Sequence, residues 1–246
     1  RACQAAGTRP CFSAERLLHP AQIHGQSHKG STYHVARILA EKIDGEITEI
    51  VLPRDFDQMC VGCAQCIKKD EKLCPHYEKL APITEAIDAA DLLIFESPVY
   101  VYHVTSAMKA LLEHYGWRWI MHRPEESMFK KQMVCIATAA GGGQKNTCQD
   151  MADSAAYWGV AKTYKYGIAV RAMKWEDVTA KTKDKIERDM DALASKIKAN
   201  QGRVKPPLKT RIFFPVMSMV LKMRPDSVDA KYWKEKGWLD GKRPWK

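Results

Sequence analysis

Short apolar runs alternate with longer amphipathic stretches along most of the chain. The apolar runs span 45–52, 91–97, 132–138 and 163–170, and they are rich in Ile, Val, Leu and Phe. Brief, nearly continuous runs of this kind are typical of strands that are covered on both faces, as in a parallel sheet. We therefore expect these segments to be strands.

Apolar residues recur at helical spacing in three other segments, which span 31–43, 105–115 and 179–199. In each of them, the apolar positions fall on one side of a helix and the polar positions on the other. Strands that alternate with helices in this way indicate a doubly wound α/β fold.

The C-terminal part of the chain differs in charge from the rest. The protein carries a net charge of +10, and residues 203–246 hold 12 Lys/Arg against 4 Asp/Glu, which is +8. The preceding residues carry only about +2, so charge does not favour nucleic-acid binding by the whole chain. We divide the chain into an unassigned segment 1–18, a domain at 19–201 and a basic arm at 202–246.

Within the arm, residues 208–223 are mostly apolar, and Pro215 interrupts them. A proline inside a helix removes a hydrogen bond, which disfavours a helix lying on a membrane surface. We favour an arm that grips a second copy of the chain in a homodimer. No run approaches the roughly 20 apolar residues of a membrane span, and no signal peptide opens the chain. We expect a cytoplasmic protein without a transmembrane segment.

Three loops have the composition of a ligand site. Residues 24–32 (HGQSHKGST) precede the first predicted helix, where backbone N–H groups and the helix dipole attract an anion; the alternative is a simple capped turn. Residues 97–102 (SPVYVY) and 139–143 (AAGGG) each follow an apolar run. The tyrosines can stack on a flat ligand, and the glycines allow backbone to approach it closely. Because ligands of open α/β sheets bind at the carboxyl ends of strands, we expect the loops to meet there.

These motifs, together with 106–115 (SAMKALLEHY), resemble the NAD(P)H-dependent flavin reductase branch of the flavodoxin superfamily over roughly residues 23–199. The resemblance implies a flavodoxin-like, doubly wound, five-stranded parallel sheet with helices on both faces, and bound FMN. It implies that the flavin phosphate is held by Ser27, Lys29, Ser31 and Thr32. It also implies that the ring is lined by Pro98, Val99, Tyr100 and Tyr102, and at its pyrimidine side by Ala140, Gly141, Gly142 and Gly143.

One stretch departs from this resemblance. The first strand of the family should come directly before the phosphate loop, where this chain has 16–23 (RLLHPAQI). Its proline and histidine fit a central strand badly, because proline cannot donate to the ladder. We expect either a short, irregular strand or an altered start of the chain.

Four of the eight cysteines form a compact motif, C-x2-C-x2-C-x7-C, at Cys60, Cys63, Cys66 and Cys74. Thiolates at this spacing can hold a [4Fe–4S] cluster or a zinc ion, or they can shape a loop without any metal. The iron–sulfur flavoproteins resemble this chain in the same motif. Two further cysteines, Cys135 and Cys148, are expected to be buried, although the second opens a helix whose dipole can lower a thiol pKa.

We predict an FMN-dependent oxidoreductase that takes reducing equivalents from NAD(P)H and passes them to an acceptor. The acceptor can be a quinone, a nitro or azo compound, free flavin or a protein. Candidates for catalysis are Tyr100, Tyr102 and His103, with His24 as another proton donor. The alternative is an iron–sulfur flavoprotein or flavodoxin-type electron carrier that does not oxidise nicotinamide.

Overall fold

Five parallel strands form one sheet in the order β2-β1-β3-β4-β5, with every neighbouring pair parallel. The computed structural model describes residues 17–246, so nearly all of the predicted segment 1–18, with Cys3 and Cys11, lies outside the described residues. The strands are β1 (Pro20–His24), β2 (Thr48–Val51), β3 (Leu92–Pro98), β4 (Gln132–Ala139) and β5 (Lys162–Ala169). This arrangement confirms the predicted flavodoxin-like α/β fold.

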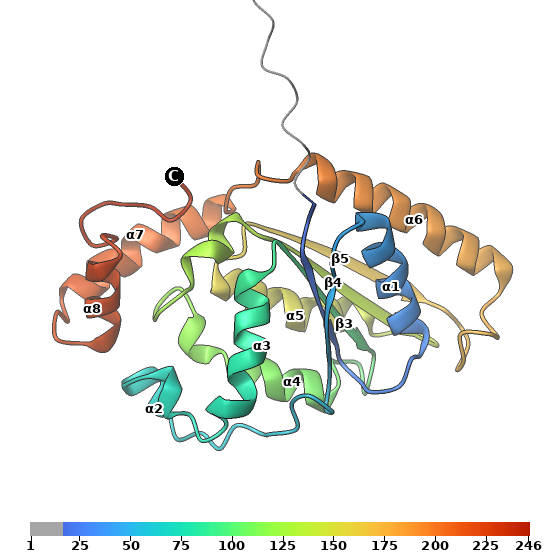
Figure 1. Ribbon diagram of the computed structural model, residues 1–246, viewed down its shortest axis with the longest axis horizontal. Coiled ribbons are helices and arrows are strands. Elements are labelled where there is room, and N and C mark those ends of the chain that lie inside the picture. Colours follow the sequence, from blue (N-terminus) through green and yellow to red (C-terminus); the bar gives the residue numbers. More distant parts are fainter. Residues whose placement is uncertain (1–16) are drawn as a thin grey trace, which may run out of the picture.

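Helices cover both faces of the sheet (Figure 1). One face carries α1 (Ser31–Ile43) and α6 (Ala180–Ala199), and the other carries α3 (Tyr77–Ala89), α4 (Ser106–Glu113) and α5 (Gln144–Trp158). Alternate residues of the strands point to opposite faces, so β3 sends Ile94 to the first face and Phe95 to the second. Each face thus has its own apolar core.

Strand β1 is regular, which corrects the expectation of an irregular first strand. All five of its residues are buried, and it pairs in register with both β2 and β3. Pro20 occupies the first position of the strand, where a missing N–H is tolerated. The histidine that looked out of place, His19, precedes the strand and accepts a hydrogen bond from Asp91 N at 3.0 Å.

Short helical segments lie between the main elements: α2 (Gln65–Lys68) and the 3-10 turns η1 (Glu71–Leu73), η2 (Gly116–Arg118) and η3 (Glu126–Lys130). Two C-terminal helices, α7 (Leu208–Lys222) and α8 (Val228–Glu235), pack back against their own chain at one end of the molecule (Figure 1). Their core gathers Phe129, Phe214, Trp233 and Trp238, and Trp233 Nε1 donates to His122 O at 2.7 Å. Within residues 17–246, no helix is both long enough and apolar enough to cross a bilayer.

Pro215 does not interrupt α7, contrary to the prediction from the sequence. The proline removes one backbone hydrogen bond, but it lies on the exposed side of the helix. On the opposite side, Phe214 and Leu221 are buried in the C-terminal core. Burial of that apolar row holds the helix together across the proline.

Candidate functional site

The carboxyl ends of β1, β3 and β4 bring the three predicted loops to one edge of the sheet. His24 pairs in register with Glu96, and Pro98 pairs with Thr138, so the strands end close to one another. The phosphate loop, the tyrosine loop (98–103) and the glycine loop (140–143) start from these ends. Their convergence at one edge is as expected for the ligand site of an open α/β sheet.

The phosphate loop leads into an uncapped helix. Gly30 is the N-cap of α1, no side chain caps the helix there, and its first turn holds no acidic residue. The N–H groups of Ser31 and Thr32 have no carbonyl partner within the helix, because the first turn leaves such donors free. The turn before α1 therefore has no side-chain cap. Ser27 and Lys29 are exposed beside these N–H groups.

Gly25 places the loop against β3. Its N–H donates to Glu96 O at 2.7 Å, and a Cβ at this position would lie 2.7 Å from the same oxygen. The Thr105 hydroxyl donates to Gly25 O at 2.5 Å and accepts from Met108 N, so it also caps α4. Only glycine fits this close approach of the loop to β3. Thr105 is a positioning residue that the sequence did not reveal.

The hydroxyl of Thr32 is already engaged by the protein. Its Oγ1 lies 2.7 Å from Thr138 Oγ1 at the end of β4, and both side chains are buried. This bond fixes the N-terminus of α1 to the sheet. Of the residues predicted to hold a phosphate, Thr32 therefore offers its backbone N–H more readily than its side chain.

The tyrosine loop is a tight, strained turn. Tyr100 and His103 exchange two backbone hydrogen bonds of 3.0 Å, and the residues between them, Val101 and Tyr102, have φ of 49° and 66°. Positive φ is unfavourable for valine and tyrosine, and such strain persists where the surrounding structure enforces it. The Tyr100 hydroxyl donates to Gln26 Oε1 at 2.8 Å, which ties this loop to the phosphate loop. Both tyrosine rings stand at the surface.

The glycine loop packs against the tyrosine loop. Gly143 has φ of 99°, and a Cβ there would lie 2.6 Å from Val99 Cγ1 and 3.1 Å from Tyr102 Cα. A Cβ at Gly142 would make ordinary contact with the Tyr102 ring, and one at Gly141 would meet nothing within 4 Å. Gly143 is thus the residue that brings the two loops together.

The two candidate histidines lie in different surroundings. His24 is buried, and its Nδ1 lies 2.9 Å from Glu96 Oε1; burial raises the pKa of that carboxyl. His103 is exposed, and its Nδ1 donates to Asp150 Oδ2 at 2.9 Å. The same oxygen accepts from Val104 N at 3.2 Å. His24 thus braces the core beneath the loops, whereas His103 stands at their rim.

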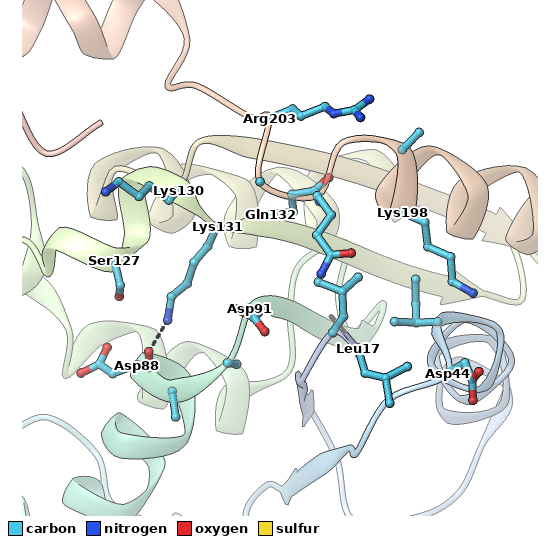
Figure 2. Close-up of a pocket in the computed structure, with 17 residues that line it drawn as sticks. Leu17, Asp44, Asp88, Asp91, Ser127, Lys130, Lys131, Gln132, Lys198 and Arg203 are labelled. Atoms are coloured by element: carbon cyan, nitrogen blue, oxygen red, sulfur yellow. Dashed lines mark hydrogen bonds between the residues drawn. The ribbon is translucent and has the colours of Figure 1, made fainter. Parts of the chain in front are cut away.

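Cavities lie at both ends of the sheet. A cavity of about 280 Å³ runs from the phosphate loop and Tyr100 to Phe56 and Met59, next to the cysteine motif. The larger cavity, about 970 Å³, lies at the amino ends of β3 and β4, where Figure 2 shows Lys131 among its walls. None of the predicted site residues lines the larger cavity.

The cysteines of the motif lie within electrostatic range of Cys66. Burial raises the pKa of the Cys66 thiol, and charge on Cys74, Cys60 and Cys63 raises it further. Among residues 17–246, the one group of at least three potential metal ligands within 4.8 Å of one another contains Cys74 and none of the other three cysteines. The turns between them contain Gly62 (φ 68°) and a strained Ala64 (φ 54°). All four are free thiols, and Cys60 and Cys63 are exposed.

A second donor set shares one of these cysteines. Ligand atoms of Cys74, His76 and His114 all lie within 4.8 Å of one another. His114 Nδ1 donates to Ala110 O at 2.7 Å, which leaves Nε2 facing His76 Nδ1 at 2.9 Å. Burial lowers the pKa of His114 and favours its neutral, ligand-competent form. The sequence did not reveal this pair, because His114 reaches the motif from the C-cap of α4.

The two cysteines outside the motif that the structure describes, Cys135 and Cys148, are buried, as predicted. Burial raises the pKa of Cys148 to about 11 and that of Cys135 well above its ordinary value. The α5 N-terminus therefore does not activate Cys148. Neither thiol is suited to nucleophilic or redox chemistry.

Residues 21–172 match the family of NADPH-dependent FMN reductases, and this range is more than half of the chain. The chain belongs to this family. Membership makes it a flavoprotein of the FMN-dependent oxidoreductase class, as the resemblance implied, and the matched range contains all three strand-end loops and the cysteine motif.

Two curated relatives are named iron–sulfur flavoproteins. The chain is 25% identical over 200 residues to an iron–sulfur flavoprotein of Archaeoglobus fulgidus, covering 79% of this chain and 86% of the relative. It is 28% identical over 94 residues to another iron–sulfur flavoprotein of that organism, covering 37% of this chain and only 45% of the relative. The fold is similar to that of an NAD(P)H:(acceptor) oxidoreductase from Paracoccus denitrificans, with a TM-score of 0.53 and 15% identity over 75% of this chain and 99% of that one.

Proposed function

We propose that the protein holds FMN across the three strand-end loops, takes reducing equivalents from NAD(P)H and passes them to a small-molecule or protein acceptor. The observation that carries this proposal is the uncapped N-terminus of α1 at Gly30, beside two loops that Gly143 locks together. A helix N-terminus without a side-chain cap or acid fits a phosphate. The paired loops fit a flat ring at the neighbouring strand ends.

The residues present fit the cofactor. The N–H groups of Ser31 and Thr32, the Ser27 hydroxyl and the Lys29 charge would hold its phosphate. Tyr100 and Tyr102 would shape the slot for the ring, with Pro98 and Val99 beneath it. N–H groups of the glycine loop, 140–143, would donate to the polar edge of the ring. The bound flavin supplies the hydride chemistry, and the chain supplies position and charge.

A proton must accompany the electrons when an acceptor such as a quinone, a nitro or an azo compound is reduced. His103 is the side chain at the rim that can supply it, because Asp150 accepts its Nδ1–H and leaves Nε2 free to exchange a proton. Free flavin and protein acceptors stay open as alternatives, because Val101 at the rim is exposed and a large molecule can approach there.

Anaerobic mixing of the purified protein with NADPH or NADH tests the proposal. We expect loss of flavin absorbance at about 450 nm with at least one of the two, and its recovery when a quinone is added. A protein that neither retains nor takes up FMN contradicts the binding proposal. A yellow protein that neither nucleotide bleaches contradicts the hydride step alone.

A second function, electron transfer without nicotinamide oxidation, is favoured by the grouped thiols of the cysteine motif. With their C-x2-C-x2-C-x7-C spacing, Cys60, Cys63, Cys66 and Cys74 would be the ligands of a [4Fe–4S] cluster, which relays single electrons. Iron and acid-labile sulfide in anaerobically purified protein, lost in Cys63→Ser, would support the cluster. Zinc without sulfide would support a mononuclear site with His76 and His114 instead. Protein free of metal would leave the thiols a structural role.

The homodimer through the C-terminal arm stays a prediction, as does the domain division at residue 201. The arm packs on its own chain, so a dimer would use the outer surface of α7 and not an extended segment. The mass of the protein in solution tests this.

A further inference from the structure

The outer face of α7 is apolar over its whole length. The inner face, with Phe214 and Leu221, is buried against the chain itself. Large apolar side chains on the outer face are exposed by 38–79%: Leu208, Ile212, Val216, Met219, Val220 and Met223. Their spacing of three and four residues places them in one continuous stripe along the helix.

Such a stripe needs an explanation. Single exposed apolar residues are common on protein surfaces, but a contiguous apolar patch marks a surface that contacts another apolar body. The sequence argued against a membrane-surface helix because of Pro215, yet α7 is continuous across it. That objection no longer holds.

The charges along the chain segment that carries the stripe are all of one sign. Between residues 203 and 225 there is no acidic residue, and the first one is Asp226. Basic residues flank the stripe at both ends of α7 and along it, and all of them are exposed: Lys205, Lys209, Arg211, Lys222 and Arg224. An apolar stripe with a purely cationic border is the pattern of helices that lie in the interface of an anionic membrane.

A second copy of the chain fits this surface less well. If two α7 helices packed stripe to stripe in a two-fold dimer, Lys205 and Lys209 of one would approach Lys222 and Arg224 of the other, or their own equivalents. Either direction brings like charges together, because the helix offers no acid to pair with them. An anionic lipid surface matches both the stripe and its border.

We propose that the outer face of α7 docks the protein on an anionic phospholipid surface. The apolar stripe enters the boundary between headgroups and acyl chains, and the cations lie at the level of the lipid phosphates. This attachment is peripheral and reversible, and it is independent of the flavin site, which other elements build.

Flotation with vesicles tests the proposal on the full-length protein. Vesicles of phosphatidylcholine alone are compared with vesicles of roughly three parts phosphatidylcholine to one part phosphatidylglycerol. We expect binding to the anionic vesicles, at least about tenfold weaker binding to the neutral ones, and release by salt above about 0.5 M. Equal binding to both vesicle types, or binding to neither, would overturn it.

Variants separate the two halves of the surface. The double change Ile212→Asn and Met219→Asn removes apolar area, and Lys209→Glu with Lys222→Glu reverses charge. Each should lower vesicle binding about tenfold or more, whereas Met173→Asn, a change at another exposed methionine, should not. Circular dichroism and flavin content, where FMN is present, check that each variant folds.

Light scattering gives the competing outcome. A particle of twice the chain mass that becomes monomeric in the Ile212→Asn, Met219→Asn variant, without vesicle binding by the native protein, would assign the stripe to a second copy. That result would overturn the membrane proposal and support the dimer. It would leave the proposed flavin chemistry unaffected.

Discussion

The two ends of the parallel sheet both carry cavities, but they have opposite chemistry. At the carboxyl end, the N-terminus of α1 presents N–H groups beside a cavity of about 280 Å³. At the amino end, the C-terminus of α3 presents carbonyls to a cavity of about 970 Å³, and Lys131 Nζ donates to Ile87 O and Asp88 O at 2.7 and 2.5 Å. Helices that run antiparallel to the strands put positive dipole ends at one edge and negative ends at the other.

The comparison shows that cavity size does not identify a site. The larger space attracts a cation from the protein itself, and that lysine already satisfies the free carbonyls of a helix end. The smaller cavity lies beside free N–H donors, a strained turn and glycines at positions where a Cβ would clash with a neighbouring loop. Four predictions test this contrast, ordered from the largest expected effect to the smallest.

Gly143→Ala should have the largest effect on the carboxyl end. Alanine there must adopt φ of 99° with its Cβ 2.6 Å from Val99 Cγ1, so the two loops must separate. We expect FMN affinity to fall by about 100-fold, or roughly 3 kcal/mol. Titration of apoprotein with FMN measures it. Gly141→Ala, where a Cβ meets nothing within 4 Å, is the matched control and should change affinity by less than about threefold.

Lys131→Met tests the amino end through pH. Burial lowers the pKa of Lys131 to about 8 from 10.5, so between these values the unfolded chain binds more protons than the folded one. Below pH 8 the folded protein carries the whole free-energy cost of the buried charge, and this cost falls as Lys131 loses its proton at higher pH. Lys131 therefore makes the free energy of unfolding increase between about pH 8 and pH 10.5. We expect the free energy of unfolding of the native protein to gain on the order of 2 kcal/mol relative to Lys131→Met from about pH 7 to about pH 10.

Urea unfolding at several pH values gives this difference. Lys130→Met, at the neighbouring exposed lysine, should follow the native protein across the range. If the difference in free energy of unfolding between the native protein and Lys131→Met does not change with pH, the fold does not lower the pKa of Lys131. FMN affinity should not change in either variant, because both side chains lie at the amino end.

His103→Asn should slow acceptor reduction without slowing flavin reduction. Loss of the rim proton donor should lower the rate with a quinone by about tenfold. Asp150→Asn should have a smaller effect in the same direction, since it only orients the imidazole through the 2.9 Å bond. Stopped-flow measurement of the two half-reactions separates them. Equal slowing of both would show that His103 acts on the flavin site as a whole.

Tyr100→Phe should have the smallest effect. It removes only the hydroxyl bond to Gln26 Oε1 and keeps the ring. We expect FMN affinity to fall by about fivefold, close to 1 kcal/mol for one neutral hydrogen bond. The same titration measures it, and Tyr102→Phe is the comparison. A larger loss in Tyr102→Phe would mean that the bond to Gln26 does not position the loop.

Local pattern predicted most of the fold. The helix at 31–43 matches α1 residue for residue, and the apolar runs matched four strands closely, because burial on both faces leaves a direct signal in sequence. Prolines misled the prediction at β1 and at α7. Pro20 sits at a strand start and Pro215 on an exposed helix side, and neither position can be told from sequence before the neighbours are known.

The candidate site was predicted in part. Its three loops and four thiols are contiguous motifs, so they were visible. Its supports were not, because Thr105, Thr138 and His114 act through partners that are far away in the sequence, which are Gly25, Thr32 and His76. A contact between residues 106 positions apart, such as Thr32 with Thr138, leaves no local trace.

The contacts of Arg123 determine which parts of this protein can be removed without disturbing the rest. Arg123 donates to the carbonyls of Cys66 and Ile67 and, at 2.5 Å, to Asp229 of α8. The same side chain therefore links the cysteine motif to the C-terminal helices. A shortened version ending near residue 201 would remove Asp229 from the buried Arg123, leaving Glu71 at 3.8 Å as its paired acid, and would expose Phe129 to water. Any study of the cysteine motif in isolation should therefore keep the last forty or so residues, because they support the position of that motif.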